Sequence, residues 1–313
     1  MKRALITGGA GFIGSNLAQR LLSEGWQVTI ADDLSSGEKE FVPSGVYEFY
    51  GDFASDTLLN WVRKQYFDVV FHLAARARVG YSVDHPGESN DINVGKTVHL
   101  LEACVDNVER FVNTSSSSVY GGASKFDLPT HENHKHNPRS PYALQKSITE
   151  RYCEMFSDVY NLETVSVRPF NVFGPNQKGD SPYSCAISAW LYAAKHGKPL
   201  RSDGDGEQTR DVTYVDNVVD VMYRCAIGPA KHFQGRAYNA GTGTRVSNNE
   251  ILAWFKKQYP NVQVVNAPTR IGDVKDTQAD IKRAENELGY KVLVSLWDGI
   301  EKTREWAMKS DKF

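Results

Sequence analysis

Short apolar runs alternate with helical stretches through the first half of this 313-residue chain. The runs are RALIT, VTIAD, VYEFYG, VVFHLAA, RFVNTSS and ETVSVRPF, and the stretches between them include 12–25, 56–66, 93–107 and 141–161. Strands that are apolar throughout and separated by helices are typical of a parallel sheet that is covered on both faces. The pattern therefore predicts an α/β fold with a doubly wound parallel sheet.

The second half of the chain has a looser pattern. After Pro175 it mixes short helices, glycine-rich turns such as DGDGEQ and isolated strands, which indicates a smaller C-terminal α+β lobe. The run TYVDNVVDVMYRCAI has helical periodicity and AYNAGTG resembles one more strand, so both could belong to the first sheet. We therefore expect a large domain of 1–170 plus about 212–242, and a second domain of 171–211 plus about 243–313.

Composition and charge argue against several classes of protein. The net charge is −2, and no run of lysine and arginine suggests a surface for nucleic acid or for an acidic membrane. The start, MKRALITGG, reaches glycines too soon for a signal peptide, and no uncharged stretch approaches the roughly 18 residues that span a bilayer. We expect no nucleic-acid partner, no membrane and a cytoplasmic protein.

Metal sites and disulfides are not expected either. The cysteines are scattered and form no CxxC unit, so they are expected to be reduced and mostly buried: Cys104, Cys153, Cys185 and Cys225. His131, His134 and His136 crowd one loop without a partner cluster, which is more typical of solvated side chains than of metal ligands.

A glycine-rich turn follows the first predicted strand. The segment TGGAGFIG places glycines at 8, 9, 11 and 14, where absent side chains let the backbone approach a pyrophosphate at the positive end of a helix dipole. Asp32 ends the second strand about 20 residues further on, where a carboxylate can accept both ribose hydroxyls and repels a 2′-phosphate. The combination favours NAD over NADP; the alternative is a plain tight turn beside a solvent-facing aspartate.

A hydroxyl cluster and a tyrosine–lysine pair indicate proton chemistry. TSSSSVYG ends the fifth strand, and the carboxyl ends of parallel strands face the ligand crevice. In SPYALQKS, Tyr142 and Lys146 lie four residues apart on one face of a predicted helix. A phenol has a pKa of about 10, and a lysine ammonium together with an oxidised nicotinamide would lower the pKa of Tyr142 towards neutrality. The alternative is an ordinary tyrosine–lysine pair on a helix surface.

Together these motifs resemble the extended short-chain dehydrogenase/reductase family, in particular its nucleotide-sugar epimerases and dehydratases. The resemblance continues through FHLAA, RPFNVFGP, TRDVTYVDNVV, YNAGTG and GDVKDTQADI, and so covers nearly the whole chain. It implies a Rossmann domain that binds NAD, a smaller domain that binds a UDP-sugar, and a catalytic trio of Ser116, Tyr142 and Lys146. It also implies a homodimer through the helices at 93–107 and 141–161.

The resemblance assigns further residues to ligand contacts. Those expected to contact NAD are Gly8, Gly11, Phe12, Ile13, Gly14, Asp32, Asp33, Ser35, Ser36, Gly37, Asp52, Phe53, Leu73, Ala74, Ala75, Arg76, Asn93, Tyr142, Lys146 and Phe170. Those expected to contact the substrate are Ser116, Ser117, Asn171, Arg210, Arg270, Asp273 and Thr277. Asp52 could equally be a helix-entry aspartate. Lys96 stands where the family usually has glycine, which affects the expected helix packing but not the chemistry.

The residues before VYG narrow the reaction. Dehydratases of this family resemble one another in an Asp-Glu pair there, since removing water needs an additional acid and base, whereas this chain has Ser117 and Ser118. We therefore expect 4-epimerisation, in which Tyr142 takes a hydroxyl proton, hydride passes to NAD, and the 4-keto sugar turns before hydride returns. An NAD-sensing module without turnover is the alternative from another class.

The sugar is less constrained. GPNQKGDSPYSCAI resembles a segment of 4-epimerases for UDP-N-acetylhexosamines, and Thr277 occupies the position where relatives restricted to glucose and galactose carry a bulky tyrosine. A small residue leaves room for an acetamido group, so the expected pair is UDP-GlcNAc and UDP-GalNAc. UDP-glucose/galactose and UDP-glucuronate/galacturonate remain alternatives, as does a nucleotide-sugar dehydratase or reductase. Asn171 disfavours glucuronate, whose epimerases tend to have threonine there.

Overall fold

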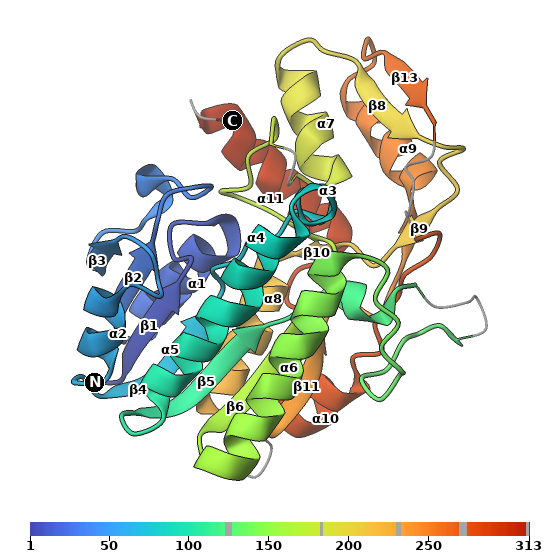
Figure 1. The fold of residues 1–313 in the computed structure, drawn as a ribbon. Helices are drawn as coiled ribbons and strands as arrows, with labels where there is room; N and C mark the ends of the chain where they lie inside the picture. The colour runs from blue at the N-terminus through green and yellow to red at the C-terminus, as the bar shows by residue number, and fades with distance from the viewer. Residues whose placement is uncertain (123–126, 182–183, 230–232, 269–273, 311–312) are drawn as a thin grey trace.

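The parallel sheet predicted from the sequence is present in the computed structural model, which describes residues 1–122, 127–181, 184–229, 233–268, 274–310 and 313. Seven strands pair in the order β11-β6-β5-β4-β1-β2-β3 (Figure 1). They are β1 (Arg3–Thr7), β2 (Gln27–Asp32), β3 (Tyr47–Tyr50), β4 (Phe67–His72), β5 (Val108–Thr114), β6 (Glu163–Pro169) and β11 (Gln234–Ala240). The strand order reverses between β1 and β4, and ligands of doubly wound sheets bind at such a reversal.

Helices cover both faces of this sheet (Figure 1). One layer holds α2 (Asp56–Val62), α5 (Lys96–Cys104) and α6 (Pro141–Tyr160), and the other holds α1 (Phe12–Ser23) and α8 (Val215–Ile227). Leu5 and Ile6 of β1 are both fully buried, but in different apolar clusters. Successive side chains of a strand point to opposite faces, so this sheet has an apolar core on each side.

The helix predicted at 93–107 has different boundaries. It is preceded by α3 (Val79–Asp84) and α4 (Pro86–Asn90), and a π-helical turn spans Asp91–Gly95 before α5 begins at Lys96. Such wide turns are often found at functional sites. Here the turn carries Asn93, whose amide nitrogen donates to Gln145 Oε1 on α6 at 2.8 Å.

Two later elements return to the first sheet, as the sequence indicated. β11 pairs in parallel with β6, and α8 packs against α1 and β11. The strand begins at Gln234, a few residues before the predicted AYNAGTG, and it ends at Ala240.

The remaining described strands pair two by two outside this sheet. The pairs are β7 (Val172–Phe173) with β10 (Thr213–Tyr214), β9 (Thr209–Arg210) with β12 (Val246–Ser247), and β8 (Leu200–Asp203) with β13 (Val264–Ala267). The helices associated with them are α7 (Ala186–Lys195), α9 (Asn248–Gln258), α10 (Lys282–Leu288) and α11 (Leu296–Lys309). In Figure 1, α7, α9, β8 and β13 form a smaller α+β part beyond one end of the sheet. Among the helices of the described ranges, none combines the length and apolar character that crossing a membrane requires.

Gly14 and Gly95 offer a matched pair of glycine-to-alanine tests. A Cβ at Gly14 would lie 2.1 Å from the carbonyl oxygen of Gly8, whereas a Cβ at Gly95 would meet no atom within 4 Å. We expect Gly14→Ala to lower the free energy of unfolding by about 1–3 kcal/mol through overpacking. Gly95→Ala should raise it by up to about 1 kcal/mol because alanine favours helix. Urea unfolding followed by circular dichroism measures both, and equal stabilities would contradict the packing argument.

Candidate active site

The glycine turn brings backbone against backbone at the end of β1. Gly8 has a φ of +75°, and a Cβ there would lie 2.7 Å from the backbone nitrogen of Ala74, which follows β4. α1 begins at Phe12 without a side-chain cap, so its first N–H groups have no side-chain acceptor at Gly11. The glycines of this turn therefore have no side chains that would block a pyrophosphate, and the first N–H groups of α1 can donate hydrogen bonds to it.

Asp32 is tied to this turn by hydrogen bonds. Its carboxylate accepts the backbone N–H of Ala10 at 2.9 Å and that of Leu34 at 2.8 Å, and the residue is 7% exposed. Burial raises the pKa of Asp32, and the two hydrogen bonds oppose that rise. Both oxygens retain lone pairs with which to accept ribose hydroxyls. Asp32 therefore also holds β2 against the glycine turn, which the sequence pattern did not reveal.

Several predicted cofactor residues meet beside Asp32. The Arg76 guanidinium contacts the Ser35 hydroxyl and lies 3.8 Å from the Asp33 carboxylate. The backbone N–H of Arg76 donates to Asn93 Oδ1 at 2.8 Å. These contacts bring together the loops after β2 and β4 and the π-helical turn, all at the same edge of the sheet.

Asp52 is paired with Lys96, the residue that departs from the family pattern. Asp52 Oδ1 accepts the backbone N–H of Ala54 at 2.9 Å, which gives it a role at the turn before α2, and Oδ2 pairs with the Lys96 ammonium. Burial acts to raise the pKa of Asp52, but these contacts outweigh it and the pKa is lowered. Lys96 begins α5 with its side chain directed to Asp52, so the helix accommodates the lysine. An adenine contact by Asp52 stays a prediction.

The three predicted catalytic residues lie together at the end of β5. Ser140 caps α6 by accepting the backbone N–H of Ala143 at 3.2 Å, and this start places Tyr142 in the first turn. The Ser116 hydroxyl is close enough to the Tyr142 phenol to lower its pKa. Lys146 Nζ donates to the carbonyl oxygen of Thr114 at 2.6 Å and lies 5.9 Å from the centre of the Tyr142 ring.

The protein groups alone raise the pKa of Tyr142, whereas the prediction concerned these groups together with an oxidised nicotinamide. Burial raises the pKa of Tyr142 to about 12, and the Ser116 hydroxyl lowers it only in part. Burial also lowers the pKa of Lys146 to about 8. Lys146 is not among the groups that shift the pKa of Tyr142, so the decrease predicted for the lysine and an oxidised nicotinamide together stays a prediction. The positive charge of an oxidised nicotinamide is the remaining contribution to a lower pKa.

Two hydroxyls at this end of β5 point to a polar ligand. Thr114 Oγ1 and Ser118 Oγ are buried and have no hydrogen-bond partner among the described residues. Buried polar atoms are rarely left unpaired in native proteins. Together with the glycine turn and Asp32, they make these residues fit a dinucleotide that runs from the end of β2 to the end of β5.

Comparison with known proteins agrees with this fit. Residues 4–241 match the NAD dependent epimerase/dehydratase family. The chain belongs to this family. Its cofactor is accordingly NAD, and the predicted resemblance is confirmed.

Three relatives illustrate the similarity. A UDP-glucose 4-epimerase of Mycolicibacterium smegmatis is 38% identical over 315 residues, which cover 97% of this chain and 98% of the relative. The structure of a Thermotoga maritima UDP-glucose 4-epimerase with UDP-glucose is 30% identical, with a TM-score of 0.91 and coverage of 97% and 98%. That of a Methanobrevibacter ruminantium UDP-N-acetylglucosamine 4-epimerase in complex with UDP-N-acetylmuramic acid is 31% identical, with a TM-score of 0.90 and coverage of 97% of each chain.

Several predicted substrate residues gather beyond β6. Asn171 Nδ2 donates to the carbonyl oxygen of Asp211 at 3.2 Å and to Thr277 Oγ1 at 3.3 Å. The Arg210 guanidinium donates to the carbonyl oxygen of Lys275 at 2.7 Å. Ser117 begins the short 3₁₀ turn Ser117–Tyr120 directly after Ser116. The predicted contacts at 270 and 273 lie outside the described residues.

Asp211, which the sequence analysis did not single out, ties the loops around this group. Its buried carboxylate accepts backbone N–H groups from Thr242 at 2.9 Å, Gly243 at 3.0 Å and Ala279 at 3.1 Å. Burial raises the pKa of Asp211, and these hydrogen bonds oppose the rise. The motif TRD contains this aspartate, so the motif was the available signal, but its partners lie far away in the chain.

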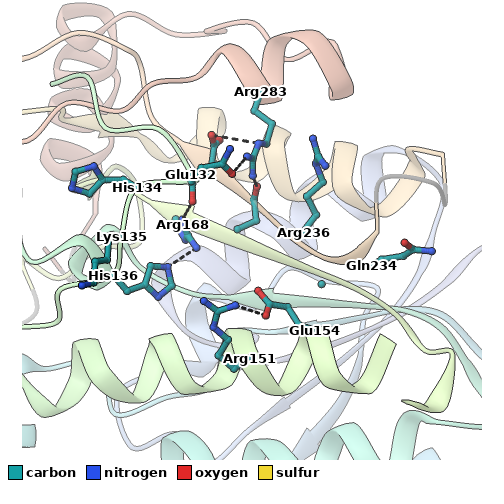
Figure 2. Close-up of a pocket in the computed structure, with 13 residues that line it drawn as sticks. Glu132, His134, Lys135, His136, Arg151, Glu154, Arg168, Gln234, Arg236 and Arg283 are labelled. Atoms are coloured by element: carbon teal, nitrogen blue, oxygen red, sulfur yellow. Dashed lines mark hydrogen bonds and ion pairs between the residues drawn. The ribbon is translucent and has the colours of Figure 1, made fainter. Parts of the chain in front are cut away.

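A separate cavity of about 590 Å³ lies beside α6 and β11 and contains none of the predicted site residues (Figure 2). Its arginines all have carboxylate partners; the pairs are Arg151–Glu154, Arg168–Glu150, Arg236–Glu287 and Arg283–Glu132. Of the histidine loop, His134 and His136 line this cavity. His136 hydrogen bonds with Ser147 at 2.6 Å and with Arg168 at 2.7 Å. Within the described ranges, no group of three or more His, Cys, Asp or Glu residues could hold a metal ion.

The pair of Lys96 with Asp52 predicts a small effect on stability. Both side chains are more than one third exposed, and exposed ion pairs contribute about 0.2–1 kcal/mol. Lys96→Ala should therefore lower the free energy of unfolding by no more than about 1 kcal/mol at low salt, with a smaller effect at 1 M NaCl. Urea unfolding at both salt concentrations measures this, with Lys64→Ala as the matched control. A loss that salt leaves unchanged would show that the lysine acts through packing.

Proposed function

We propose that this protein is a UDP-sugar 4-epimerase that interconverts UDP-GlcNAc and UDP-GalNAc through a transient 4-keto sugar. The observation that carries the proposal is the meeting of Ser116, Tyr142 and Lys146 at the end of β5, on the same sheet edge as the glycine turn. The 4-epimerase names of the similar proteins support the reaction type.

The residues divide the work as follows. Ser116 hydrogen bonds with the sugar oxygen that reacts, and its hydroxyl also orients the Tyr142 phenol. Tyr142 takes the proton of that sugar hydroxyl and later returns it. Lys146, with its pKa lowered to about 8, is mostly protonated at pH 7 and supplies a fixed positive charge near the phenol. NAD, when bound, accepts hydride from the sugar and gives it back.

The hydroxyls beside Ser116 favour epimerisation over dehydration. Ser117 and Ser118 occupy the two positions where the family's dehydratases carry an acid and a base, and neutral hydroxyls do not perform that proton work at neutral pH. The keto sugar is therefore reduced again instead of losing water.

Substrate binding is proposed for the second domain, 171–211 plus about 243–313, and NAD binding for 1–170 plus about 212–242. Arg210 suits the diphosphate because a guanidinium binds phosphate oxygens two at a time. The small side chain of Thr277 lies beside Asn171 and supports the N-acetylhexosamine assignment by leaving space for an acetamido group. UDP-glucose/galactose is the second candidate because the relatives include UDP-glucose 4-epimerases.

Product analysis tests the reaction directly. Purified protein incubated with UDP-GlcNAc, without added cofactor, should form UDP-GalNAc that anomeric proton NMR detects. Tyr142→Phe should lower kcat by at least about 100-fold because it removes the acid–base group. Tyr160→Phe, at the exposed end of the same helix, is the matched control and should leave kcat unchanged.

Other products would redirect the proposal. A 4-keto-6-deoxy sugar would contradict epimerisation, and turnover of UDP-glucose or UDP-glucuronate alone would move the substrate assignment. Unchanged activity of Tyr142→Phe would contradict the proposed role of Tyr142 as acid and base. It would then favour the alternative of an NAD-sensing module.

We also propose that two copies associate through α5 and α6. α6 carries an apolar stripe at helical spacing that is not fully covered within one chain: Leu144, Ile148, Tyr152, Met155 and Val159. Leu144 is 49% exposed and Val159 is 61% exposed. A second copy of the same face would remove this apolar surface from water.

Disrupting this stripe should change the oligomeric state. Leu144→Glu places a charge in the proposed interface, so we expect a dimer to become a monomer in light scattering at micromolar concentration. Lys309→Ala, at the end of α11 and on neither proposed interface helix, should leave the dimer intact. A monomeric unmodified protein would contradict the interface.

A further inference from the structure

α6 meets the end of β5 through three side chains spaced four residues apart. The Tyr142 phenol is close enough to the hydroxyl of Ser116 for that hydroxyl to lower its pKa, and Lys146 Nζ donates to the carbonyl oxygen of Thr114 at 2.6 Å. The third is Glu150, one turn further along, which accepts a hydrogen bond from the hydroxyl of Ser115. Ser115, which lies between Thr114 and Ser116, is thus bound by the Glu150 carboxylate.

Glu150 is fixed by a buried arginine. The Glu150 side chain is 2% exposed. Arg168 on β6 donates a hydrogen bond to each of its oxygens, from Nε at 2.8 Å and from Nη2 at 2.5 Å. Because the guanidinium binds both oxygens of the carboxylate, it fixes the orientation of the Glu150 side chain as well as its position.

Arg168 is itself held from several sides. Its Nη1 donates to the Tyr120 hydroxyl at 2.7 Å and to the carbonyl oxygen of Glu132 at 3.0 Å, and Nη2 is bonded to His136 at 2.7 Å (Figure 2). A buried ion pair contributes little to stability compared with apolar packing, so stability alone does not account for charges at this place. What the arrangement does provide is a fixed position for the carboxylate beneath the catalytic group.

We propose that Glu150, held by Arg168, is a positioning residue for the reaction. It holds the strand end 114–116 against α6, so that Ser116 stays beside Tyr142 while Lys146 stays bound to Thr114. The inference rests on the proposed function. Among the described residues, Glu150 forms no hydrogen bond with the Tyr142 phenol or the Lys146 ammonium, and it acts through Ser115 and through its charge.

The charge of Glu150 also acts on Lys146. Burial lowers the pKa of Lys146 to about 8, while Cys153 and Glu150 oppose that decrease. Burial raises the pKa of the Cys153 thiol, which keeps it neutral, and His72, which faces Lys146 from β4, has its pKa lowered to about 3 by burial and is neutral as well. Glu150 is therefore the charged group that raises the pKa of this ammonium against the effect of burial.

Two variants separate the positioning role from a structural one. Ser115→Ala deletes the hydroxyl that links the strand to Glu150 but leaves the Glu150–Arg168 pair intact. Glu150→Gln removes the charge with little change of shape. Both should lower kcat by at least about tenfold while KM for the UDP-sugar stays within twofold, because the substrate contacts are elsewhere. Glu154→Gln, one turn along the same helix and partly exposed, is the matched control and should behave like the unmodified protein.

Lysine titration provides a readout that does not depend on turnover. In protein labelled with carbon-13 at lysine Cε, the Lys146 signal, assigned by its absence in Lys146→Arg, should titrate at lower pH in Glu150→Gln. It should be unchanged in Glu154→Gln. Unchanged kcat in Ser115→Ala together with an unchanged Lys146 titration in Glu150→Gln would overturn the inference. If Glu150→Gln does not fold, the kcat of Ser115→Ala decides. If the unmodified protein turns over no UDP-sugar, the proposed function fails, and the lysine titration alone decides the inference.

Discussion

Covering both faces of a parallel sheet leaves only the strand ends for chemistry. β1, β4 and β5 lie side by side, and each ends with a polar residue at the same edge. Thr7 and His72 are joined there by a hydrogen bond of 2.7 Å, and His72 reaches Thr97 at 2.8 Å. The next strand, β5, ends at Thr114 and leads into Ser115 and Ser116, so the sheet itself brings together the glycine turn and the phenol that we propose transfers the proton.

The electrostatics of this edge depend on desolvation. His72 and Tyr142 are held neutral by burial, and Lys146 has a lowered pKa for the same reason. A neutral phenol is a poor base until a further positive charge arrives, and oxidised NAD carries such a charge. In the proposed reaction, bound NAD would therefore couple the protonation of Tyr142 to its own oxidation state, since loss of the ring charge on reduction would favour return of the proton. Glu150 and Arg168 keep the partners in register while these charges change.

Local patterns in the sequence predicted the strands, the glycine turn and the positions of Ser116, Tyr142 and Lys146. Such features depend on neighbouring residues, and they were found in the expected elements. The rise that burial alone gives to the pKa of Tyr142 was not predicted, because sequence spacing does not show burial. The pair of Glu150 with Arg168 and the contacts of Asp211 were missed because they join distant parts of the chain, with separations that no local motif encodes.

The return of β11 to the edge of β6 has a consequence for biosynthesis. A chain that leaves the ribosome N-terminus first already contains the glycine turn and the whole of α6 when β6 emerges, yet that strand keeps an open edge until Ala240 has been translated. Unpaired strand edges recruit other strands and promote aggregation. A transcript truncated between β6 and β11 would thus yield a polypeptide that contains Tyr142 but has an unpaired edge on β6. Chaperones bind such aggregation-prone chains.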